Sequence, residues 1–162
     1  MLFGNPSKFA IQADYVPEWS HQGSKYGVFS VFVNWNLMGS NSASPEDLWF
    51  QTDQLNDFFK KNPHPIELPE NFREKEPLAL LTLLVEFTFP TDASVPAAKN
   101  CWDYVISPNA LHDKGFFLFR YAVAGQEAIL GGSITSGFAT VTSNPVGYVF
   151  QVIIDARKFC DA

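Results

Sequence analysis

The side chains best suited to metal chemistry in this 162-residue chain are three histidines and two cysteines, which lie far apart in the sequence. His21, His64 and His112 stand in unlike polar segments. Neither they nor Cys101 and Cys160 form an HxxxH, CxxC or HExxH spacing, and such spacings are what bring metal ligands together on one element. The sequence therefore predicts no metal site and no cofactor. It favours free thiols, although one bridge between the two cysteines stays open.

Residues suited to nucleophilic or acid–base catalysis also lack a recognisable arrangement. The stretch GGSITSG (131–137) is neither the GxSxG of a nucleophile elbow nor a P-loop, because no lysine follows its glycines. Asp14, Glu86, Asp103 and Glu127 could supply a carboxylate pair for acid–base catalysis. A chain with 17 acidic residues offers such pairs by chance. We therefore expect the protein not to be an enzyme.

An uneven distribution of charge is the clearest binding signal. Between residues 44 and 76, eight acidic and four basic residues give a net charge of −4, out of −6 for the whole chain. Such a stretch favours a basic partner through electrostatic complementarity, and the absence of a basic stripe argues against nucleic acid. Trp49 could anchor a partner or belong to the core. The predicted partner-binding residues are Glu46, Asp47, Trp49, Asp53, Asp57, Glu67, Glu70 and Glu74. The alternative is that this stretch is only a solvated helix and loop.

Two strands are predicted near the start of the chain. Phe9, Ile11, Ala13 and Tyr15 alternate with polar residues, which is the period of a half-buried strand. Residues 27–35 form a second strand rich in β-branched and aromatic side chains. The short polar connection between the two strands predicts an antiparallel hairpin.

Helices and further strands alternate over the rest of the chain. Ser44 before Pro45 resembles a helix N-cap, and Thr52 before Asp53 resembles a second helix start. Residues 78–89 are ambiguous: the first half favours a helix, and the alternation from Val85 to Phe89 favours a strand. We predict strands at 116–123 and 127–130 and a helix over 146–158, with a strand as the competing interpretation of the last segment. The predicted fold is α+β, a single domain over residues 1–162 with a mostly antiparallel sheet and two to four helices packed on it.

The ends and the apolar runs of the sequence bear on location. The first residues lack the charged and apolar regions of a secretory signal. The longest apolar run, from Pro77 to Val85, is too short to span a bilayer. We therefore expect a complete cytoplasmic chain that has no membrane partner.

Three stretches carry a family pattern: FGNPSKFAIQADYVPEW (3–19), GVFSVFVN (27–34) and SPNALHDKGFFLFRY (107–121). They resemble immunity protein family 42 of bacterial polymorphic toxin systems. The resemblance covers the beginning and the final third of the chain. Its matching residues are Gly4, Asn5, Pro6, Lys8, Phe9, Ala10, Ile11, Trp19, Gly27, Asn34, Pro108, Leu111, Asp113, Gly115 and Phe119.

The resemblance implies a small cytosolic antidote that binds and blocks a cognate toxin domain and does no chemistry itself. Many toxins of such systems are basic nucleases, which would suit the acidic stretch. Two other classes stay open. One is an adaptor or secretion chaperone, which would also be small, acidic and cytosolic. The other is a small-molecule-binding domain that uses an aromatic pocket.

Overall fold

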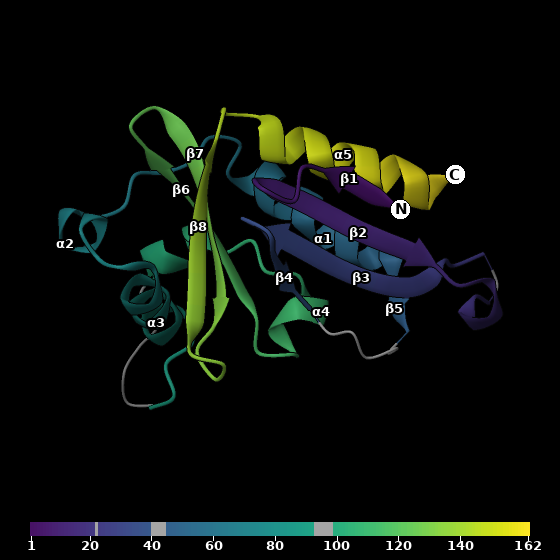
Figure 1. Ribbon diagram of the computed structural model, residues 1–162, viewed down its shortest axis with the longest axis horizontal. Helices are drawn as coiled ribbons and strands as arrows, with labels where there is room; N and C mark the ends of the chain where they lie inside the picture. The colour runs from purple at the N-terminus through teal and green to yellow at the C-terminus, as the bar shows by residue number, and fades with distance from the viewer. Residues whose placement is uncertain (22, 40–44, 93–98) are drawn as a thin grey trace.

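The structure, a computed structural model, describes residues 1–21, 23–39, 45–92 and 99–162, which form two antiparallel sheets with helices packed against them (Figure 1). In the first sheet the order is β1–β2–β3–β4, and β5 also pairs with β3. In the second the order is β6–β7–β8. The strands are β1 Leu2–Gly4, β2 Phe9–Tyr15, β3 Tyr26–Val33, β4 Asn36–Met38, β5 Glu46–Asp47, β6 Phe117–Val123, β7 Gln126–Ser133 and β8 Phe138–Asn144. The α+β class is confirmed.

The predicted hairpin at the start of the chain is formed by β2 and β3. Their register runs from Phe9 opposite Val33 to Tyr15 opposite Gly27. Phe9 and the other inward-facing residues of β2 are fully buried, whereas Tyr15, at the end of the strand, is 42% exposed. A short 3₁₀ helix, η1 (Pro17–Trp19), lies in the connection. The period-two pattern therefore predicted the buried face correctly except at its last position.

Two long helices cover one face of the first sheet. Helix α1 (Leu48–Lys61) and helix α5 (Tyr148–Asp161) lie side by side there, and α5 also packs on β1 and β2 (Figure 1). Leu55 and Phe59 of α1 and Ile153 of α5 enter one hydrophobic core with the inward-facing residues of β2 and β3. The two helices therefore contact each other along a line that we call the seam. The side chains on the side of the seam away from the sheet face the solvent.

A second core lies between helix α3 (Pro77–Thr88) and the second sheet. Leu81 and Leu84 of α3 pack there with Phe119 of β6 and Leu130 of β7. The 3₁₀ helix η2 (Lys99–Tyr104) and two four-residue helices, α2 (Glu70–Arg73) and α4 (Asn109–His112), complete the helices of the described residues. Phe58 packs against both cores and so links the two sheets through α1.

The structure corrects two local predictions. Thr52 lies inside α1, where its hydroxyl donates to the Leu48 carbonyl at 2.9 Å, so no helix begins there. The proposed cap at Ser44 lies outside the described residues. The strand interpretation of Val85–Phe89 is wrong because α3 continues to Thr88, whose hydroxyl donates to the Leu84 carbonyl at 2.6 Å. The helix predicted over 146–158 is confirmed as α5, which begins at Tyr148 and ends at Asp161.

Candidate functional site

The eight predicted partner-binding residues lie on two separate parts of the molecule. Five of them belong to β5 and α1, whereas three lie in or beside α2. Figure 1 shows β5 and α2 toward opposite ends of the molecule. The structure therefore does not gather the acidic stretch into one patch. The first group is Glu46, Asp47, Trp49, Asp53 and Asp57, and the second is Glu67, Glu70 and Glu74.

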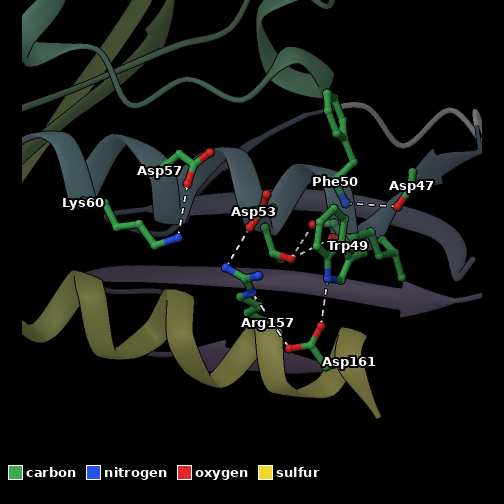
Figure 2. A network of polar contacts seen from close by, with 10 residues as sticks. Asp47, Trp49, Phe50, Asp53, Asp57, Lys60, Arg157 and Asp161 are labelled. Carbon is green, nitrogen blue, oxygen red and sulfur yellow. Dashed lines mark hydrogen bonds and ion pairs between the residues drawn. The ribbon is translucent and has the colours of Figure 1, made fainter.

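The two carboxylates of β5 are used inside the fold. Asp47 is the N-cap of α1, and its side chain accepts a hydrogen bond from the Phe50 backbone N–H at 3.0 Å (Figure 2). A carboxylate at this position also interacts favourably with the helix dipole. Glu46 forms an ion pair with Lys114 at 3.0 Å, and both side chains are less than one-fifth exposed. These two residues therefore fix the start of α1 rather than presenting free charge.

Trp49 and Asp53 join α1 to α5 across the seam (Figure 2). The Trp49 indole N–H donates to Asp161 Oδ1 at 2.8 Å, and the Arg157 guanidinium lies 5.6 Å from the Trp49 ring centroid. Arg157 pairs with Asp53 at 2.7 Å, and both of these side chains are about one-quarter exposed. This seam cluster of Trp49, Asp53, Arg157 and Asp161 holds two helices together. Trp49 nevertheless keeps 41% of its surface exposed.

The remaining acidic side chains are open to solvent. Asp57 faces Lys60 of the same helix at 3.4 Å, and its side chain is 53% exposed. Glu67 pairs with Arg73 at 2.8 Å and is 72% exposed. Glu70 and Glu74 are also exposed. Because exposed ion pairs contribute little to stability, these four carboxylates are available to a partner at small cost to the fold.

A buried polar cluster that the sequence did not predict ties the end of α1 to the second sheet. The Arg120 guanidinium pairs with Glu127 and donates to the carbonyls of Asn62 at 2.5 Å and Pro63 at 3.1 Å. It also lies 4.1 Å from the centroid of the Phe59 ring. Glu127 and Asn144 are fully buried and lie opposite each other in the register of β7 and β8. The sequence signal that could have predicted this cluster was the presence of Arg120 and Glu127 within two apolar strands of one hairpin.

The other residues with chemical potential are dispersed. Cys101 and Cys160 are free and buried in different cores, so they do not pair. Burial raises the pKa of both thiols, which keeps them protonated at neutral pH. Within the described residues, no group of three or more His, Cys, Asp or Glu side chains could hold a metal ion. No helix in that part of the chain is long and apolar enough to cross a membrane.

A mainly apolar cavity of about 330 Å³ lies where α1 ends and α5 begins. Two phenylalanines line it, and its volume is at the lower limit for small-molecule sites. Its lining residues are Phe59, Lys60, Pro63, His64, Arg120, Val146, Gly147 and Phe150.

Comparison with known proteins covers nearly the whole chain. A family model described as Immunity protein 42 matches residues 1–160. A search of curated proteins finds no match. Among solved structures, the crystal structure of CdiI from Burkholderia dolosa aligns with a TM-score of 0.80 at 24% sequence identity. The alignment covers 98% of this chain and 99% of that one, so the two share a fold.

Proposed function

This chain belongs to the immunity protein 42 family, and from that we propose that it neutralises a cognate toxin domain by binding it, without catalysing a reaction. The observation that carries the proposal is the family match over residues 1–160, which includes both sheets and the acidic stretch. We propose further that residues 1–162 act as one immunity domain and that the protein works in the cytoplasm, where it would meet an incoming toxin.

The positions of the carboxylates support binding rather than acid–base catalysis. Of the four considered for catalysis, Asp14 accepts a hydrogen bond from Gln12 on β2, and Glu86 is exposed on α3. Asp103 is exposed in η2, and Glu127 is buried against Arg120. A catalytic pair needs both carboxylates within reach of one substrate. These four are distributed over separate elements instead.

The exposed carboxylates are our proposed contacts for a basic toxin surface. Asp57, Glu67, Glu70 and Glu74 carry charge at the surface, whereas Glu46, Asp47 and Asp53 act by holding α1 in place. Trp49 contributes the exposed part of its ring. Charges at the rim of an interface act mainly on the association rate and its salt dependence. The proposal therefore makes a kinetic prediction.

The test uses the cognate toxin domain, produced as an inactive variant. Reversal of Glu70 and Glu74 together to lysine should slow association and flatten its dependence on ionic strength, measured by stopped-flow fluorescence. The matched control reverses Glu18 and Asp113, which are exposed and lie outside the stretch. Equal slowing in both variants would contradict the acidic contact surface. Failure of the wild-type chain to bind the toxin domain would contradict the function itself.

A further inference from the structure

The most exposed large hydrophobic side chain of the described residues is Trp35, whose surface is 69% accessible. It lies in the two-residue turn between β3 and β4, where Val33 pairs with Asn36. Within the described residues, the indole makes no hydrogen bond and no ring contact. Burial therefore does not explain why tryptophan, which has the largest side chain, occupies this position.

The backbone conformation of this turn is energetically unfavourable for tryptophan. Asn34 and Trp35 have φ values of +48° and +67°, the pattern of a type I′ hairpin turn. Asparagine suits the first position and glycine the second, because glycine has no Cβ to clash there. A bulky residue with positive φ is an outlier. The fold thus keeps Trp35 where glycine would be less strained.

A second hairpin of the same chain shows the ordinary solution. The turn between β6 and β7, where Val123 pairs with Gln126, consists of Ala124 and Gly125. Their φ values are +48° and +74°, so the backbone follows the same path. Glycine fills the position that corresponds to Trp35. The turn conformation therefore does not require an aromatic side chain at this position.

The surroundings hold the strained turn in place. The Trp35 N–H donates to the Pro6 carbonyl at 2.6 Å, and the Asn34 N–H donates to the Lys8 carbonyl at 3.0 Å. The Asn34 amide also donates to Thr140 Oγ1 of β8 at 3.2 Å, and the Asn36 amide donates to the Asn34 carbonyl at 2.8 Å. The turn is therefore fixed by the connection between β1 and β2 on one side and by β8 on the other. Strain maintained by its surroundings occurs mainly at functional sites.

We propose that Trp35 is a preorganised anchor that inserts into an apolar pocket of the cognate toxin domain. Tryptophan is enriched at the hot spots of protein interfaces, where one apolar anchor is enclosed by a polar rim. Asn34, Asn36 and Thr140 supply such a rim. A side chain on a backbone that is already fixed loses less entropy on binding. One ring with polar neighbours is a small part of the area that a stable dimer of this chain would need.

This inference rests on the proposed function, and the test separates the two. We would measure by calorimetry how tightly the Trp35→Gly variant binds the inactive toxin domain. We would also measure the melting temperature of the free variant. Loss of a hot-spot side chain should weaken binding by about 30-fold or more. Glycine at this φ should leave the melting temperature unchanged or raise it. Ala124→Gly is the matched control, since it relaxes the other turn and should leave binding unchanged.

The outcomes are distinct. If the wild-type chain binds and Trp35→Gly binds within about twofold of it, the anchor is wrong and the proposed function stands. If Trp35→Gly lowers the melting temperature together with affinity, Trp35 serves the fold and the inference is overturned. A change in sedimentation of the free protein, without loss of toxin binding, would assign Trp35 to self-association and also overturn it. If the wild-type chain does not bind, both proposals fall.

Discussion

Asp53 and Asp57 lie one helical turn apart on α1, yet their surroundings differ. Asp53 faces Arg157 of α5 across the seam, with both side chains about one-quarter exposed. Among the described residues, Asp57 pairs with Lys60 of its own helix alone, and it is 53% exposed. A partly buried, charge-assisted bond between elements contributes more to stability than an exposed pair within one helix.

The two residues therefore give a matched pair of substitutions. Asp53→Asn should lower the free energy of unfolding by about 1–2 kcal/mol, because Arg157 loses its closest charged partner. Asp57→Asn should change it by less than about 0.5 kcal/mol. Urea denaturation of both variants measures the difference. Equal losses would mean that the seam cluster does not hold α1 to α5.

The same contrast shows how far the sequence could go in predicting the candidate site. The charge count predicted which stretch is acidic. It could not show that Asp53 is paired, because Arg157 lies far along the chain and meets it only when both helices pack on the sheet. It also gave no sign of Trp35, since a strained turn is visible only once the φ values are known.

Elements with strong local periodicity were predicted and those without it were missed. The alternation of β2 and the helical face of α5 are local patterns, so they survive in the fold. The alternation near the end of α3 is misleading, because exposed Phe87 and buried Thr88 reverse the polarity that a strand would need. Strand β8 was missed, although Thr140, Val141 and Thr142 are β-branched residues typical of strands.

The contact between α1 and the second sheet depends on the buried pair of Arg120 and Glu127. Arg120 is 4% exposed and Glu127 is 0% exposed. Removing one member leaves the other charge buried without its partner, so Glu127→Ala should cost about 3–5 kcal/mol in unfolding free energy. Thermal or urea denaturation would measure it.

A double variant tests whether the charge pair itself is needed. Arg120→Met combined with Glu127→Met replaces both charges by apolar side chains, and it should be more stable than Glu127→Ala. If the double variant were instead the less stable, the hydrogen bonds from Arg120 to the Asn62 and Pro63 carbonyls would be the dominant contribution. In that outcome the contact between elements would depend on backbone anchoring rather than on the charge pair.

At the scale of the whole molecule, the two cores are joined through Phe58. The protein built around them has two kinds of surface. Exposed carboxylates lie on α1 and around α2, and an exposed aromatic side chain lies on the fixed turn after β3. The sequence resemblance covered the two ends of the chain, and the family match now includes the middle. Both kinds of surface suit a protein that acts by binding a partner protein.

We propose that this protein neutralises its toxin by binding it in a defined ratio. The most direct measurement is a titration of the active cognate toxin domain with the purified chain, at toxin concentrations well above the dissociation constant. We predict that toxin activity falls linearly and reaches zero at one equivalent. Full toxin activity at every ratio, or complete loss at a small fraction of one equivalent, would contradict the account, since the latter requires catalytic turnover.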